Sequence, residues 1–161
     1  MAVEIEFKFL VQKSSWLQSQ ARKTAVVFEI EQGYISTTPE AVVRIRLKNQ
    51  KAYLTIKGKA KGPIRPEFEY EIPYSEAKEL LSLCKSRIHK KRYVVHFENH
   101  TWEIDEFEAS NAPLILAEIE LNHPEESFRK PSWILDDITN DHRYSNSSLS
   151  RTPYQQWKNH K

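Results

Sequence analysis

The sequence predicts a mainly β fold (α+β) with roughly eight antiparallel strands, arranged as a sheet or barrel, and about three helices. Three observations lead to this prediction. Apolar and charged residues alternate with a period of two along much of the chain. Short polar turns, such as Asn99-His100, separate consecutive runs and suit hairpins. Strong helix signals are few. No boundary divides the chain, so residues 1–161 are predicted to form one domain.

The predicted strands are taken in order from the N-terminus. They cover residues 4–9, 25–37, 41–48, 52–57, 67–73, 88–98, 101–107 and 114–121. Residues 58–66 contain two glycines and two prolines, which favours a loop. A helix is predicted over 75–81 because Ser75 is a good N-cap. Residues 12–22 are predicted to form a short helix or a loop, and the tail from Ile134 only short helical turns.

Composition excludes several classes of protein. The 24 basic and 22 acidic residues leave a formal net charge of +2, without the surplus that marks nucleic-acid binding. The single cysteine, Cys84, excludes an intrachain disulfide and fits a reducing compartment. No apolar run approaches the roughly 20 residues of a membrane helix, and acidic residues stand where a signal peptide needs apolar ones. The prediction is a cytoplasmic protein with neither a nucleic-acid nor a membrane partner.

Same-sign charges recur two residues apart, so that they share one face of their strand. The groups are Glu4 and Glu6; Arg44 and Arg46; Glu67, Glu69 and Glu71; Lys90 and Arg92; Glu103 and Asp105; Glu118 and Glu120. Any one strand with a solvated face would alternate in this way. The repetition in nearly every strand favours an enclosed charged interior, with the apolar faces outside under helices or a partner. Paired carboxylates attract a divalent cation and paired arginines an oxyanion, so the ligand that matches both is a metal–polyphosphate.

The chain resembles the CYTH superfamily of triphosphate tunnel metalloenzymes. The segment Glu4-Ile5-Glu6-Phe7-Lys8 is similar to the E-x-E-x-K signature of that family. The resemblance continues, in order, through Gln32-Gly33-Tyr34, Arg44-Ile45-Arg46, Leu54–Lys57, Glu67–Glu71, Lys90–Tyr93, Trp102–Phe107, Ala117–Glu120 and Asp141–Tyr144. It implies an eight-stranded antiparallel barrel that forms a charged tunnel, with a few helices outside. It also implies metal-dependent attack of water on a terminal phosphate.

The resemblance also implies roles for particular residues. The metal-binding acids, for Mg²⁺ or Mn²⁺, are Glu4, Glu6, Glu118 and Glu120. The residues that bind phosphate are Lys8, Arg44, Arg46, Lys57, Arg92 and, near one tunnel mouth, Arg143. Lys90 matches a lysine thought to help activate water, with Tyr34 near it, although Tyr34 suits a core position equally well. Such a role requires a lowered Lys90 pKa, which the neighbouring Arg92 would favour. His142 departs from the family pattern, because some short members have a lysine there.

The predicted function is hydrolysis of a triphosphate, with inorganic tripolyphosphate preferred because the length and the Gln-Gly-Tyr segment resemble short bacterial inorganic triphosphatases. Thiamine triphosphatase and adenylate cyclase activities, which use the same kind of tunnel, remain alternatives. A non-catalytic polyphosphate-binding module and an ordinary domain that binds protein partners are further alternatives. Pairing with a second copy through the outer apolar surface is left open.

Overall fold

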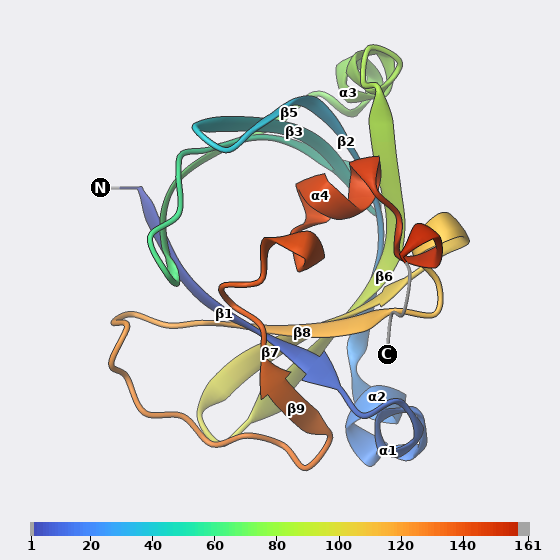
Figure 1. Cartoon of the computed structure of the whole chain (residues 1–161). Helices are drawn as coiled ribbons and strands as arrows, with labels where there is room; N and C mark the ends of the chain where they lie inside the picture. Colours follow the sequence, from blue (N-terminus) through green and yellow to red (C-terminus); the bar gives the residue numbers. More distant parts are fainter. Residues whose placement is uncertain (1, 158–161) are drawn as a thin grey trace.

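Eight antiparallel strands close into a barrel in the computed structural model, which describes residues 2–157 (Figure 1). The strands are β1 (Val3–Val11), β2 (Val26–Thr38), β3 (Ala41–Lys48), β4 (Lys51–Lys57), β5 (Ile64–Ile72), β6 (Ser86–Phe97), β7 (His100–Phe107) and β8 (Ile115–Glu120). Their order around the barrel is β5-β4-β3-β2-β6-β7-β8-β1, and β5 pairs back with β1. The predicted fold class is confirmed.

Strand β1 closes the barrel by changing partners along its length. Near its start Glu4 is opposite Arg65 of β5, and further on Glu6 and Lys8 are opposite Glu120 and Glu118 of β8. The acidic start of the chain therefore lies beside both neighbouring strands. Beyond the barrel, β9 (Ile134–Asp137) adds to the end of β1. The prediction of only helical turns in the tail was wrong here, because four residues are too few to establish a period.

Three helices cover the outside of the barrel. Helices α1 (Lys13–Gln18) and α2 (Gln20–Thr24) lie at one side, and the buried Trp16 packs there with Tyr93 and Trp102. Helix α3 (Tyr74–Leu81) covers β3 and β4. These positions match the predicted apolar exterior. No helix within residues 2–157 has the length and apolar character needed to cross a membrane.

Close packing on the outside of β2 explains why a glycine, Gly33, stands in the middle of the Gln-Gly-Tyr segment. A Cβ atom at this position would lie 2.8 Å from the Cβ of Cys84 and 2.9 Å from a methyl carbon of Leu81. The outer face of β2 therefore has no room for a side chain at Gly33, because Leu81 at the end of α3 and Cys84 just after it already occupy that space. The flanking Gln32 and Tyr34 point to the interior, where both are buried.

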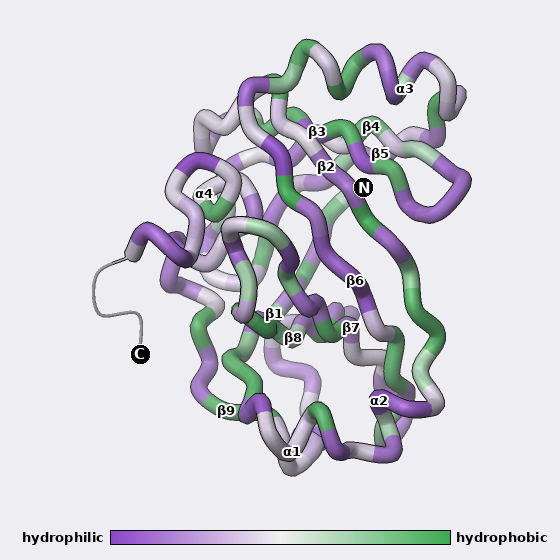
Figure 2. Tube along the Cα trace, turned by 90° about the vertical axis from the view of Figure 1, so that its right-hand side faces the viewer, coloured by the Kyte–Doolittle hydropathy of each residue, from purple (hydrophilic) through white to green (hydrophobic). Residues whose placement is uncertain are grey.

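The C-terminal segment lies over one end of the barrel. The C-terminal segment contains η2 (His142–Tyr144), α4 (Asn146–Arg151) and η3 (Tyr154–Gln156). A further short turn, η1 (Ala109–Asn111), connects β7 to β8. In Figure 1, α4 lies within the ring of strands, and the turned view of Figure 2 places it at one end. The few helices predicted outside the barrel are α1, α2 and α3, whereas α4 lies within the ring of strands at one end (Figure 1 and Figure 2).

An apolar cluster fills this end of the interior. Ile88 and Leu116 share the strand faces of Lys90 and Glu118, so they point inward, and they pack with Tyr144 and Leu149 of the C-terminal segment. Leu149 is fully buried. The interior is thus charged along most of its length and apolar at one end.

Candidate functional site

The barrel encloses a cavity of about 270 Å³ that is lined mainly by charged side chains. All of the predicted site residues line it except Arg143. The alternation along β3 illustrates why: Arg44 and Arg46 point into the cavity, while Ile45 and Leu47 pack outside beneath α3. Closure of the barrel brings such faces from all eight strands together.

Two of the predicted metal ligands are held by basic neighbours. The Glu4 carboxylate lies 3.0 Å from Nζ of Lys57, and Glu118 lies 3.4 Å from Nζ of Lys8 and 3.1 Å from the Arg92 guanidinium. Burial alone would raise the pKa of Glu118, yet Lys8 and Arg92 outweigh it and lower this pKa to about 2. Both acids are therefore ionised at neutral pH.

The other two predicted metal ligands lack such compensation. Glu6 and Glu120 are directly opposite each other on β1 and β8. Burial, together with the charges of Glu118 and Glu4, raises the pKa of Glu6 well above its usual value. Burial and neighbouring carboxylates, Glu4 foremost, raise the pKa of Glu120 to about 7. Around Glu6 and Glu120 the cavity therefore holds more carboxylate groups than the nearby basic side chains can neutralise.

The donor set fits a hard divalent cation, because Mg²⁺ and Mn²⁺ prefer carboxylate oxygens. Burial and then the charges of nearby carboxylates raise the pKa values of Glu6 and Glu120, and a bound cation would offset that negative charge. Within residues 2–157, no three acidic, histidine or cysteine side chains are already gathered tightly enough to hold a metal. The pairs of Glu4 with Lys57 and of Glu118 with Lys8 must loosen for these acids to share one ion.

The basic residues are also incompletely neutralised. Arg46 is buried and donates from Nε to Gln32 Oε1 at 2.8 Å, but no described carboxylate pairs with it. Burial, with the charges of Arg44 and Arg92, lowers the pKa of Arg46 to about 10. Arg44 bonds Thr55 and Glu69 through Nη2, while its buried Nε has no hydrogen-bond partner. Arg46 therefore lines the cavity without a described carboxylate partner, and Arg44 lines it beside Arg46, so the two guanidinium groups suit an oxyanion.

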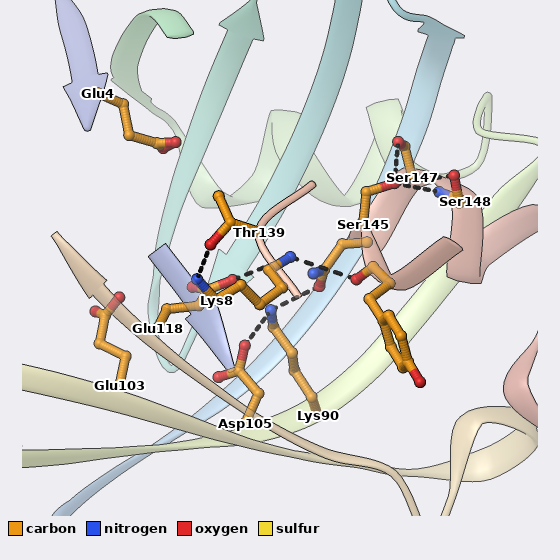
Figure 3. Close-up of polar contacts among 12 residues, drawn as sticks. Glu4, Lys8, Lys90, Glu103, Asp105, Glu118, Thr139, Ser145, Ser147 and Ser148 are labelled. Atoms are coloured by element: carbon orange, nitrogen blue, oxygen red, sulfur yellow. Dashed lines mark hydrogen bonds and ion pairs between the residues drawn. The ribbon is translucent and has the colours of Figure 1, made fainter. Parts of the chain in front are cut away.

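Lys90 occupies a particular environment (Figure 3). Its side chain is 1% exposed, and Nζ donates at 2.7 Å to Oδ2 of Asp105 and at 2.7 Å to Oδ1 of Asn146. Burial lowers the pKa of Lys90 to about 7, with Arg92 and Arg46 adding to the effect and Asp105 opposing it. The direction matches the prediction, but burial and not Arg92 is the main cause. Tyr34 lines the cavity and also bonds Gln32 Nε2 at 2.9 Å.

Arg143 lies away from the cavity. Its side chain is 66% exposed, bonds Asp141 at 2.6 Å and lies over the Trp157 ring at 5.1 Å. The neighbouring Asp141 and His142 line the cavity instead. The structure therefore does not bring Arg143 together with the other predicted phosphate ligands.

Sequence reasoning missed several cavity residues. Lys48 continues the inward face of Arg44 and Arg46, and this alternation was sufficient to find it. Thr139 and Asn146 belong to the irregular C-terminal segment, where no period indicates a direction. Their position depends on packing far from them in the sequence.

A closed antiparallel barrel whose interior gathers arginines, lysines and carboxylates defines a tunnel protein for an anionic ligand and its counter-cation. The chain belongs to the CYTH domain family, whose profile matches residues 2–153.

Known proteins of similar sequence span almost the whole chain. An inorganic triphosphatase of Acetivibrio thermocellus is 46% identical over 160 residues, which cover 98% of this chain and 99% of that protein. An inorganic triphosphatase of Nitrosomonas europaea is 28% identical, with 91% and 96% coverage. The crystal structure of an inorganic triphosphatase superposes with a TM-score of 0.65 at 27% identity, covering 93% of this chain and 95% of that one.

Proposed function

We propose that this protein is a divalent-metal-dependent triphosphatase that releases phosphate from inorganic tripolyphosphate. The observation that carries the proposal is that two buried arginines, Arg44 and Arg46, the second without a described carboxylate partner, line the same cavity as crowded carboxylates. A metal–triphosphate would neutralise both kinds of charge at once. The similarity to proteins named inorganic triphosphatase supports the same activity, and CYTH triphosphatases are metal-dependent.

The basic residues position the substrate. The guanidinium groups of Arg44, Arg46 and Arg92 match phosphate oxygens in a bidentate manner, whereas Lys8 and Lys57 act as point charges. Phosphoryl transfer depends mostly on such positioning and on charge stabilisation. Glu4, Glu6, Glu118 and Glu120 would hold Mg²⁺ or Mn²⁺, which when bound would neutralise phosphate charge.

Lys90 is the proposed base. With a pKa of about 7, a large fraction of its amine is neutral at physiological pH and can accept the proton of the attacking water. Tyr34 lines the same cavity and is proposed to help orient the reacting groups. Arg143 is left out of the proposed phosphate site, because its side chain is exposed and bonds Asp141.

The test is a panel of substrates with the purified protein. Phosphate release from tripolyphosphate, ATP and thiamine triphosphate is measured with Mg²⁺, with Mn²⁺ and with a chelator. We expect release from tripolyphosphate to be fastest and to stop with the chelator. Failure to release phosphate from any of the three would refute the proposal. Preference for thiamine triphosphate, or formation of cyclic AMP from ATP, would establish one of the alternative activities.

A variant separates catalysis from binding alone. Glu118→Gln keeps the shape of the side chain but removes a metal ligand, so we expect turnover to fall at least about 100-fold. Tripolyphosphate without metal should still raise the melting temperature of the variant, because the basic residues remain. If turnover is unchanged in Glu118→Gln, the metal assignment is wrong.

The proposal also concerns partners and location. The partner is a small triphosphate rather than a nucleic acid or membrane, and the single free cysteine suits the cytoplasm. The outer face of β5 exposes Phe68 and Tyr70, by 44% and 56%, which supports pairing with a second copy there. Sedimentation of the wild-type protein and of Phe68→Glu tests that pairing, and a monomeric wild-type protein would exclude it.

A further inference from the structure

Asn146, the first residue of α4, bonds to two residues of the barrel wall. Its Oδ1 accepts from Nζ of Lys90 at 2.7 Å and from Nε2 of Gln32 at 3.1 Å. Helix α4 lies at the end of the barrel, so this side chain brings the C-terminal segment into contact with the proposed base. Nothing in the sequence pattern indicates such a contact.

The polarity of these hydrogen bonds is fixed by Arg46. The Arg46 Nε can only donate, so the Gln32 atom beside it at 2.8 Å must be the oxygen. The Nε2 of the fully buried Gln32 then faces Asn146 and donates to it. The atom that Asn146 presents must therefore be its oxygen, and Lys90 must be the donor to it. One guanidinium group thus sets the direction of each bond from Arg46 to Lys90.

This polarity orients the Lys90 amine. A neutral amine has two N–H bonds and one lone pair. Asp105 Oδ2 and Asn146 Oδ1, each 2.7 Å from Nζ, accept the two N–H bonds. The lone pair then occupies the remaining direction at Nζ. Because Lys90 lines the cavity, we take this direction to face the cavity. Without Asn146, the amine could turn an N–H bond toward the place where a water must give up its proton.

We propose that Asn146 is a positioning residue that holds the amine of Lys90 with its lone pair toward the cavity. The inference rests on the proposed triphosphatase function. In the reaction the water oxygen forms a new bond to the terminal phosphorus of tripolyphosphate, and the water proton moves to Nζ of Lys90. The phosphoanhydride P–O bond breaks, and pyrophosphate leaves with the bridging oxygen and the electron pair of that bond. Asn146 takes no proton and touches Lys90, not the substrate's reacting atoms.

Helix α4 is anchored well enough for this role. The Ser145 hydroxyl accepts from the Ser148 backbone N–H at 3.2 Å, which caps the helix. Ser150 bonds Ser86 of β6 at 2.9 Å, and Leu149 is fully buried in the apolar cluster. A side chain on such a fixed helix can hold the amine more precisely than one on a free loop.

The charges around Lys90 give a test with a definite sign. Those that face it come from four strands: Arg92 of β6, Asp105 of β7, Arg46 of β3 and Glu118 of β8. Asn146→Asp adds a further carboxylate on α4 and favours the charged amine. We expect the acid limb of the kcat profile to move up by about one pH unit or more, with activity returning at higher pH. Asn146→Ala adds no charge, so kcat should fall about 10-fold or more across the whole range, with KM changed less than about twofold.

The experiment combines kinetics with a direct measurement of the amine. The ¹⁵N chemical shift of Lys90 Nζ is titrated in metal-free, substrate-free wild-type, Asn146→Asp and Arg151→Ala proteins. Arg151→Ala is the matched control, because Arg151 is an exposed residue of the same helix. We expect the Lys90 pKa to rise only in Asn146→Asp, and kcat to be unchanged in Arg151→Ala.

Two failures can be told apart. If the wild-type protein hydrolyses no triphosphate, the proposed function is refuted before Asn146 is considered. If the wild-type protein is active and both Asn146 variants match Arg151→Ala in kcat and acid limb, the positioning role is refuted. A loss of activity in Asn146→Ala accompanied by a large rise in KM would also overturn it, because that pattern indicates substrate binding.

Discussion

Lys90 and Asp105 form a buried ion pair in the barrel interior, with Nζ 2.7 Å from Oδ2 and with the two side chains 1% and 2% exposed. The same carboxylate also binds Arg92, whose Nε lies 2.8 Å from Oδ1. One negative charge therefore serves two basic groups. Burial is the main cause of the Lys90 pKa of about 7, whereas Arg92 stays charged because Glu103 and Glu118 pair with it in addition to Asp105.

Asp105→Asn should destabilise the fold strongly. The substitution removes the carboxylate that the buried Lys90 and Arg92 share, and the loss of a buried charge partner typically costs about 3–5 kcal/mol. The matched control is Glu103→Gln, because Glu103 also pairs with Arg92, at 3.2 Å, but is 35% exposed. We expect the control to cost less than about 1 kcal/mol. Urea unfolding measures both, and equal losses would contradict the central place given to Asp105.

Stability should fall on acidification. Arg92 and Lys90 outweigh burial and hold the pKa of Asp105 well below its usual range, and Glu118 has a pKa of about 2. Both pKa values are lower in the folded state, so the unfolded state binds more protons as the pH drops. The stabilisation from Glu118 is complete above about pH 4.5 and is lost as the pH falls toward 2, whereas that from Asp105 declines below its ordinary pKa of 3.8 and is only partly lost at pH 2. The unfolding free energy measured between pH 5 and 2.5 should decline, and less steeply in Asp105→Asn; equal slopes would refute this account.

Arg46→Met should affect ligand binding more than folding. Arg46 is buried without a carboxylate partner, so removing its charge relieves a desolvation cost while leaving Gln32 Oε1 without its donor. We expect the melting temperature of the free protein to change by only a few degrees. The increase in melting temperature caused by tripolyphosphate with Mg²⁺ should largely disappear.

The control for that experiment is Arg143→Gln. Arg143 is exposed and bonds Asp141, so its loss should leave both melting temperatures almost unchanged. An equal loss of the tripolyphosphate effect in Arg143→Gln would show that Arg143 turns into the tunnel mouth. That outcome would restore the role that the family resemblance implies for this residue.

The charged interior was predictable because it depends on strand geometry alone. Residues two apart share a face, and the repetition of same-sign charges on nearly every strand indicated that the faces of Glu4, Arg44 and Glu118 turn inward together. The same rule extends to Ile88 and Leu116, which follow the faces of Lys90 and Glu118, and so it also locates the apolar end of the interior.

The C-terminal segment was not predictable in this way. Asn146 reaches Lys90 only because α4 is packed into the barrel end through Leu149, and residues 134–157 have no regular apolar period. Arg143 illustrates the converse. Its neighbour His142 lines the cavity, whereas the Arg143 side chain is exposed and bonds Asp141. Both residues belong to one 3₁₀ turn, and a sequence motif does not indicate which of the two side chains faces the cavity.

Leu149→Ala tests whether docking of α4 supports catalysis as well as stability. Leu149 is fully buried against the apolar cluster, so its truncation should cost about 2–5 kcal/mol in urea unfolding. The matched control is Leu83→Ala, because Leu83 is 70% exposed and its truncation should cost little.

The same Leu149→Ala variant tests the link between α4 and activity. A loosened α4 places Asn146 less firmly against Lys90, so kcat should be reduced even at temperatures far below the one at which the variant unfolds. The proposed metal ligands lie on β1 and β8, which are held in place by backbone pairing with each other and with β5 and β7, so Mn²⁺ affinity should be retained. A destabilised Leu149→Ala protein with wild-type kcat would show that α4 only seals the barrel, whereas lost Mn²⁺ affinity would show that the whole interior had relaxed.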